Sequence, residues 1–172
     1  MSLVEFDKLS DSSRLWIFGA TNTVGEKQKD FIKYSMQRFV EQWVSHKSEV
    51  TASWQLKYNR FFFLAVDESN TDVSGCSIDS MVHSLQQIES ETGYDIVNNQ
   101  SKVFYRDKNS EIHCVERQEF KQLAENAEID ENTVVFNNTI QSLAELRDGK
   151  WEVPMSGSWH GKVFKTTVQN TH

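Results

Sequence analysis

Two segments of this 172-residue chain are apolar at nearly every position, and they constrain the fold more than any other feature. Arg14–Ala20 reads RLWIFGA, and Phe61–Val66 reads FFFLAV. A strand with one face in water alternates apolar and polar residues, whereas an unbroken apolar run is typical of a strand covered on both faces. We therefore expect a β-sheet whose two faces are both covered by other elements.

The elements around these runs predict the order β-α-β-β-α-β over residues 14–106. The expected strands are Arg14–Ala20, Val50–Tyr58, Phe61–Val66 and Lys102–Arg106, and the expected helices are Gly25–His46 and Ser77–Thr92. In both helices the apolar residues recur at three- and four-residue spacing, which gives each helix one buried stripe. This order predicts an α+β protein with a ferredoxin-like core.

The C-terminal third is expected to complete the domain. Its pattern predicts a strand at Glu111–Glu116 and helices at Gln118–Asn126 and Thr133–Arg147. A ferredoxin-like core leaves one sheet face open, so this additional strand and these helices should cover it, with a second copy of the protein as the alternative. We expect one domain over residues 14–164, with flexible ends at 1–13 and 165–172.

Charge and composition exclude several classes of protein. The net charge is −7, and nucleic-acid binding through phosphate contacts needs a surplus of Lys and Arg. No apolar run approaches the ~20 residues of a membrane span, and the first residues do not resemble a secretory signal. Two cysteines are too few for a disulfide scaffold. We expect a soluble, cytoplasmic protein that binds neither nucleic acid nor membranes.

The connection between the third strand and the second helix is the candidate site. Cys76 lies at the start of that helix, where unpaired N–H groups and the helix dipole stabilise a thiolate or a bound anion. The residues expected to bind a small molecule or an anion are Ser74, Gly75, Ser77 and Asp79, with Trp159 as a wall of the pocket. The expected pocket lies between residues 67–79 and residues 151–160.

Two alternatives to a binding protein remain open. In the first, Cys76 is the nucleophile or redox thiol of an enzyme, with Asp67 or His160 as its partner. His83 lies on the same helix as Cys76 but about 10 Å further along its axis, which is too far for a hydrogen bond. In the second, the protein is non-catalytic and uses an apolar sheet face to form a homodimer or to bind another partner.

The sequence does not identify a cofactor. The side chains of Asp67, Cys76 and His83 are competent metal ligands, but no pair has the spacing of a known metal motif, so no metal site is assigned. The chain also lacks a phosphate-binding P-loop, a dinucleotide-binding glycine turn and a nucleophile elbow.

The chain resembles a family of small uncharacterised bacterial proteins of about this length. The residues that carry the resemblance are Leu15–Ala20, Arg60-Phe61, Val66–Glu68, Ser74–Asp79 (SGCSID), Trp151–Pro154 and Ser158-Trp159. Some members are labelled "ABC transporter ATPase", but this chain has neither the Walker lysine nor the signature motif of that class. The resemblance implies a single folded unit, and it brings no known activity to this chain.

Overall fold

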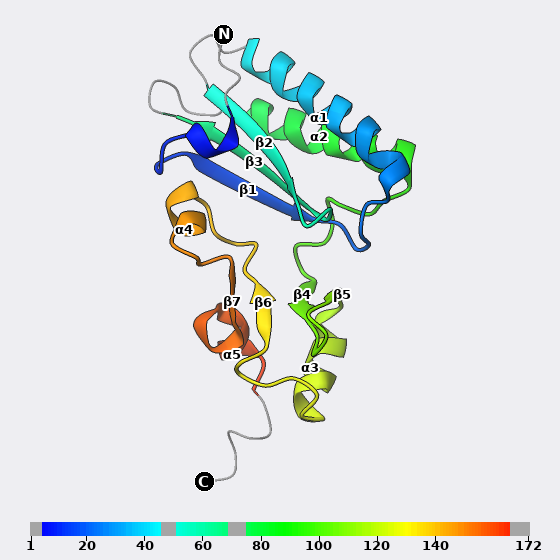
Figure 1. The fold of residues 1–172 in the computed structure, drawn as a ribbon, viewed down its shortest axis with the longest axis vertical. Coiled ribbons are helices and arrows are strands. Elements are labelled where there is room, and N and C mark those ends of the chain that lie inside the picture. Colours follow the sequence, from blue (N-terminus) through cyan, green and yellow to red (C-terminus); the bar gives the residue numbers. More distant parts are fainter. Residues whose placement is uncertain (1–4, 46–50, 69–74, 166–172) are drawn as a thin grey trace.

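The computed structural model describes residues 5–45, 51–68 and 75–165, which form stacked layers (Figure 1). The first sheet contains β1 (Arg14–Gly19), β2 (Thr51–Lys57) and β3 (Phe61–Asp67). Its order is β1-β3-β2, and both pairings are antiparallel. Every residue from Phe61 to Val66 is buried. The prediction that this strand lies in the middle of a sheet covered on both faces is confirmed.

Two helices cover one face of this sheet. They are α1 (Glu26–Ser45) and α2 (Gly75–Thr92), which pack on each other and on the sheet (Figure 1). The core between them includes Ile32, Met36 and Val40 of α1, Met81, Leu85 and Ile88 of α2, and Phe62, Leu64 and Val66 of β3. These are the stripes that sequence periodicity indicated, so both predicted helices are confirmed.

The C-terminal third covers the opposite face. There the buried core joins Leu15, Ile17, Phe61, Phe63 and Ala65 of the sheet to Phe104, Phe136, Ile140, Leu143 and Trp151. The Trp151 ring meets those of Phe61 and Phe63 edge to face, with centroids 5.0 and 4.9 Å apart. The protein itself therefore covers the face for which a second copy was the alternative.

The N-terminal segment adds to the same core. It contains the short 3-10 helix η1 (Phe6–Lys8). Phe6 and Leu9 are buried in this core, and Arg147 forms an ion pair with Asp11 at 2.7 Å. The sequence analysis left residues 1–13 outside the domain, and the described part of that segment packs against it because it supplies two apolar side chains.

A second sheet lies beyond this core. Its strands are β4 (Val103–Arg106), β5 (Ile112–Val115), β6 (Val134–Phe136) and β7 (Glu152–Pro154), in the order β5-β4-β6-β7 with every pairing antiparallel. The strand predicted at Lys102–Arg106 thus pairs here rather than in the first sheet. The molecule is an α+β protein, and its described residues form two antiparallel sheets and five α-helices.

The remaining helices correct one prediction. α3 (Arg117–Glu125) agrees with expectation, and α5 (Trp159–Val163) follows the 3-10 helix η2 (Met155–Gly157). The helix expected at Thr133–Arg147 is instead strand β6 followed by α4 (Leu143–Arg147). The cause is pairing of residues 134–136 with β7, together with a helix start at Ser142, whose hydroxyl accepts from the Glu145 N–H at 3.2 Å.

The described helices were also considered as membrane spans. None of them combines the length and the apolar character that crossing a bilayer would require.

Candidate functional site

The connection at residues 67–79 is described only at its two ends. Asp67 ends β3 and is half-buried, whereas Ser74 and the Cys76 side chain lie outside the described residues. Gly75 begins α2 and is exposed, and Ser77 is half-buried. The polar loop between Glu68 and Gly75 lies outside the described residues. The thiol at position 76 and its proposed role therefore stay a prediction.

One predicted ligand-binding residue lines a cavity. Asp79 and His83, both exposed on α2, face Phe39 and Trp43 of α1 across a hollow of about 530 Å³. The rings of Phe39 and Trp43 stack with centroids 5.2 Å apart. This hollow lies on the helical layer, away from the tail that was expected to form its other wall.

His160 and Trp159 lie in the opposite part of the molecule. Both belong to α5, and the first sheet separates α5 from α2 (Figure 1). His160 is only 1% exposed and its ring stacks on that of Trp159, with the ring centroids 3.8 Å apart. Its Nδ1 and the Ser158 hydroxyl share a hydrogen bond of 2.7 Å. The structure thus does not bring His160 or Trp159 to Asp67 or to the start of α2, the two described ends of the 67–79 connection.

Burial also sets the charge of His160. Desolvation, followed by the nearby Arg117 cation, lowers the His160 pKa to about 4. The imidazole is neutral at pH 7 and is already bonded through Nδ1. Cys114, the cysteine whose side chain the structure describes, is a protonated thiol at pH 7, because burial raises its pKa to about 11.

Arg60 is a buried cation that the sequence analysis did not single out. Its guanidinium donates to the backbone carbonyls of Ala20 (3.1 Å), Thr21 and Ile112 (2.6 Å), and desolvation lowers its pKa. All three partners are main-chain oxygens. Arg60 therefore joins the end of β1 to strand β5 and has a structural role.

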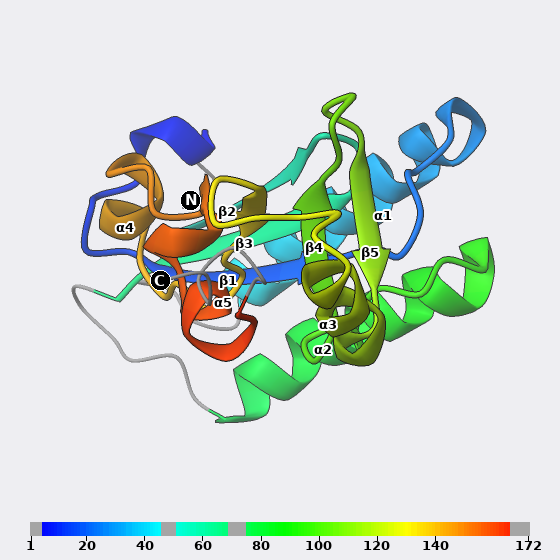
Figure 2. The same ribbon diagram turned by 90° about the horizontal axis from the view of Figure 1, so that it is seen from below.

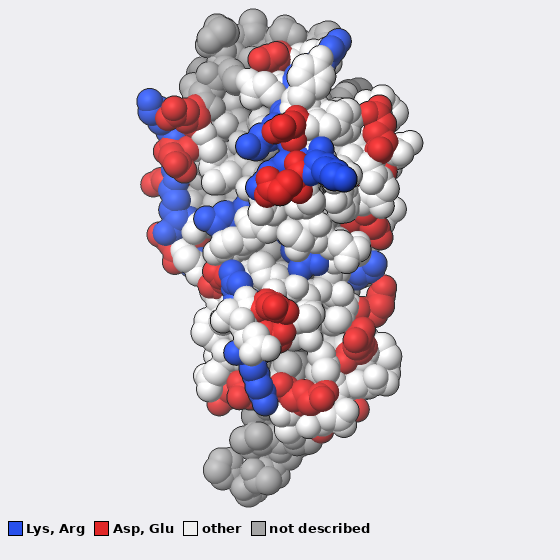
Figure 3. Space-filling view, turned by 45° about the vertical axis from the view of Figure 1, so that its right-hand side comes forward, with Lys and Arg blue, Asp and Glu red and all other residues white. Residues whose placement is uncertain are grey.

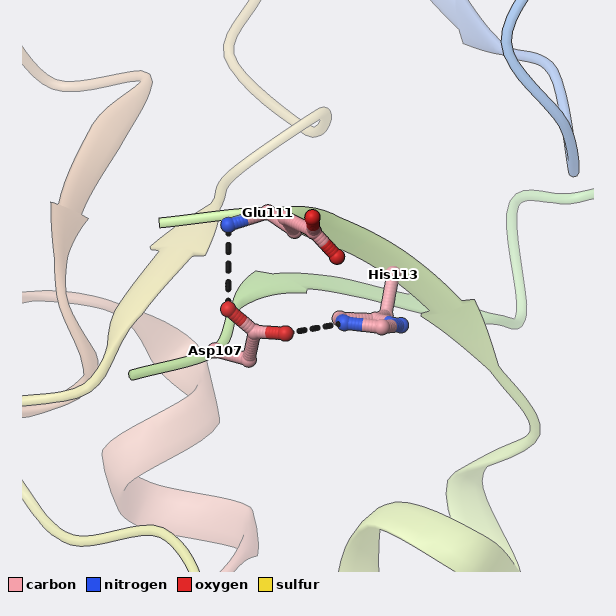
Figure 4. A group of neighbouring side chains, drawn as sticks. All are labelled: Asp107, Glu111 and His113. Carbon is pink, nitrogen blue, oxygen red and sulfur yellow. Dashed lines mark hydrogen bonds and ion pairs between the residues drawn. The ribbon is translucent and has the colours of Figure 1, made fainter. Parts of the chain in front are cut away.

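The turn between β4 and β5 gathers a second set of charged side chains (Figure 4). Asp107, Glu111 and His113 each offer a ligand atom, and these atoms lie within 4.8 Å of one another. Tyr105 pairs with His113 across the hairpin, and the Asp107 N–H donates to the Glu111 carbonyl at 2.9 Å. Since side chains two apart along a strand share a face, this register places all three on one side.

Asp107 is the fixed member of this group. Its Oδ1 accepts from the backbone N–H groups of Asn109 at 2.8 Å and Glu111 at 3.0 Å, and its Oδ2 accepts from His113 Nε2 at 2.6 Å. The His113 hydrogen bond, followed by those backbone bonds, lowers the Asp107 pKa. A carboxylate held from two sides is a pre-organised acceptor for a cation.

A cavity of about 580 Å³ adjoins Asp107. The β4–β5 turn, which projects from the second sheet in Figure 2, forms one wall. The other wall comes from Leu123 and the segment 128–134. The lining residues are Tyr105, Arg106, Asp107, Lys108, Asn109, Ser110, Leu123, Glu128, Ile129, Asp130, Asn132, Thr133 and Val134.

Carboxylates surround the Tyr105 side chain at this cavity. Burial, and then the charges of Glu119, Asp107 and Glu128, raise the Tyr105 pKa. Arg106 is neutralised by Glu152, to which it donates from Nε at 2.8 Å and from Nη2 at 2.7 Å. Acidic and basic side chains are intermixed over the face of the molecule that Figure 3 presents.

A signal for the Asp107 group was present in the sequence. The pattern D-x-x-x-E-x-H spans residues 107–113, which cover the connection between the strands predicted at Lys102–Arg106 and Glu111–Glu116 and the first half of the second strand. Folding a two-strand hairpin at that turn places these three residues on one face. The group can supply two carboxylates and one imidazole to a divalent cation.

Comparison of the chain with protein-family models, with curated proteins and with solved structures finds no match.

Proposed function

We propose that the protein is a small-molecule-binding domain whose ligand carries a protonated amine. The cavity beside the β4–β5 hairpin is its binding site, in preference to the 67–79 connection. The observation that carries the proposal is the set of three carboxylates that line the cavity, those of Asp107, Glu128 and Asp130, of which Asp107 is held by hydrogen bonds to both of its oxygens. A volume of about 580 Å³ lies within the range of small-molecule sites.

The charges of the lining support a cation rather than an anion. Asp107, Glu128 and Asp130 contribute three carboxylates, while Lys108 is the lining cation that has no counterion among the described residues. Asp130 Oδ1 accepts from the Asn132 N–H at 2.8 Å, which holds its carboxylate in place. An ammonium group bonded to such carboxylates gains charge-assisted hydrogen bonds.

The test is calorimetric titration of the whole chain with 1,4-diaminobutane in buffer containing EDTA. Butane-1,4-diol has the same length without the charge and should not bind. Asp107→Asn keeps the acceptor oxygen that the turn uses, so the fold should persist while diamine affinity falls at least about tenfold, which corresponds to about 1.4 kcal/mol. Glu128→Gln should weaken binding in the same direction.

The matched control is Glu125→Gln on α3, which removes an exposed carboxylate that does not line the cavity. Binding should be unchanged in this variant. Equal affinities for diamine and diol, or equal losses in Asp107→Asn and Glu125→Gln, would contradict the proposal.

A divalent cation is the second candidate ligand, which the closeness of the Asp107, Glu111 and His113 ligand atoms favours. Titration with Zn²⁺ in the absence of EDTA tests it. His113→Gln should weaken Zn²⁺ binding and leave diamine binding intact, because the imidazole does not line the cavity. If Zn²⁺ does not bind, or binds equally well to His113→Gln, the site is assigned to the amine alone.

We also propose that the first sheet with α1 and α2 is a three-strand form of the ferredoxin-like arrangement. The strand order β1-β3-β2 and the placement of both helices on one face support this. The fourth strand of that arrangement would lie beside β1, whereas β4 pairs with β5 and β6.

A further inference from the structure

Tyr105 is a buried residue at the wall of the cavity beside the β4–β5 hairpin. It is only 9% exposed, and strand β4 holds it between β5 and β6, where it pairs with His113 and Val135. Its ring stacks on that of His113 and meets that of Phe120 edge to face, with centroids 5.4 Å apart in both pairs. The ring is therefore fixed, and the small accessible part of the side chain lies at the cavity that Tyr105 lines.

The Tyr105 hydroxyl has no hydrogen-bond partner among the residues that the structure describes. Its oxygen is not sealed inside the protein either, so the hydroxyl reaches the space of the cavity. Water can pair with such a group in a cavity without ligand. A ligand that displaces this water must supply a partner of its own, because a hydroxyl left unpaired beside a bound ligand weakens binding.

This hydroxyl lies close to the carboxylates that would bind the amine. Burial, and then the charges of Glu119, Asp107 and Glu128, raise the Tyr105 pKa, so the hydroxyl keeps its proton at pH 7 and can donate it to a hydrogen bond. Asp107 accepts three hydrogen bonds, and a carboxylate has about four acceptor sites, so one remains for a ligand. The ammonium site and the Tyr105 hydroxyl therefore face the same part of a ligand.

We propose that Tyr105 selects ligands in which a neutral oxygen lies next to the protonated amine, as in a vicinal amino alcohol. The inference rests on the proposed function and narrows its ligand class. The ammonium group donates to the carboxylates of Asp107 and Glu128, and the neighbouring oxygen accepts from the Tyr105 hydroxyl. A carboxylate in place of that neutral oxygen would be repelled, because it would lie beside two like charges.

The experiment is calorimetric titration of the whole chain at pH 7 with 1,4-diaminobutane and with 1,4-diaminobutan-2-ol, in buffer containing EDTA. The two probes have the same chain and the same two amines, and they differ by one hydroxyl group. The amino alcohol should bind about fivefold more tightly, the factor that one net hydrogen bond of about 1 kcal/mol provides. Ornithine, which carries a carboxylate beside its α-amine, should bind more weakly than 1,4-diaminobutane.

Two tyrosines provide matched variants. Tyr105→Phe keeps the ring between His113 and Phe120 and removes only the hydroxyl, so this variant should no longer distinguish the amino alcohol from the diamine. Tyr34 is exposed on α1 and does not line the cavity, so Tyr34→Phe should retain the fivefold difference. Circular dichroism of both variants reports whether the fold persists.

The outcomes separate this inference from the proposed function. Equal affinities of the unchanged chain for the diamine and the amino alcohol would overturn the inference alone, and so would tighter binding of ornithine than of the amino alcohol. A difference that persists in Tyr105→Phe, or the loss of both probes from that variant, would also overturn it. A chain that binds neither probe would overturn the amine site together with this inference.

Discussion

The two sheets differ in how deeply their strands are buried. Every position of β3 from Phe61 to Val66 is buried, whereas every residue of β5 is only half-buried. The first sheet is enclosed between α1 and α2 on one side and the C-terminal third on the other. The second sheet has short strands, and its turn presents Asp107, Glu111 and His113 at the surface. The deeply buried residues and the group of charged side chains thus lie in different layers.

The largest expected effect comes from removing a ring from the first sheet. Phe61→Ala should lower the free energy of unfolding by about 3–5 kcal/mol, because it leaves a cavity among Phe104, Phe136 and Trp151. Val115→Ala in β5 should cost about 1 kcal/mol, since its side chain is only half-buried. Urea unfolding measures both, and equal losses would remove the contrast between the layers.

The pH dependence of stability tests the burial of His160, which is deeply buried in the second layer. The pKa of His160 is about 4 in the folded chain and 6.5 when it is free, so the unfolded chain takes up the proton first as pH falls. The free energy of unfolding should therefore fall between pH 6.5 and pH 4, by roughly 3 kcal/mol in all from this group. Above pH 6.5 the imidazole is neutral in both states, so His160 should not make the free energy of unfolding depend on pH.

His160→Gln should remove that part of the slope, whatever its own stability. Chemical unfolding at a series of pH values, for the unchanged chain and the variant, gives the difference between the two slopes. Parallel curves would show that the His160 pKa is not shifted.

Gly19→Ala probes the contact between the two layers. A Cβ atom at position 19 would lie 2.5 Å from the ring of Phe104, a fully buried side chain of β4. We expect a loss of about 1–3 kcal/mol from overpacking. Phe104→Leu in the same chain should recover part of it, and a double-mutant cycle measures that coupling. Additive losses would show that the layers accommodate each other freely.

The smallest effect on stability is expected at the hairpin turn. Asp107→Asn keeps a side-chain oxygen for the N–H groups of Asn109 and Glu111, so the melting temperature should change little. Diamine binding should nevertheless fall, as argued above. A large drop in melting temperature would mean that Asp107 serves the fold of the turn rather than ligand binding.

The first layer could be predicted from the sequence because its signals are local and strong. Phe61–Val66 is apolar throughout, and α1 and α2 each show one apolar stripe. The same apolar runs, which have no polar face, also predicted that the C-terminal third covers the second face of the first sheet. The pairing of Val103–Arg106 with β6, in place of a position in the first sheet, was beyond this reasoning, because a strand pattern does not specify its partner.

The helix predicted over 133–147 shows where periodicity misleads. Val135, Phe136, Ile140 and Leu143 are all buried, and their spacing also fits a helical stripe. Pairing with β7, a strand that the sequence analysis did not predict, decides in favour of β6. The Asp107 group was missed for a related reason, because its members meet only when the hairpin has formed its register.

The bonds of Arg60 have a consequence for how the molecule comes apart. Two of its carbonyl partners follow β1, and the third belongs to β5. Separating the layers would break the Arg60–Ile112 bond that joins the two sheets and would expose to water the core that they share, which includes Ile17, Phe61 and Phe104. The two sheets should therefore melt in one cooperative transition, and neither half of the chain should be an autonomous folding unit.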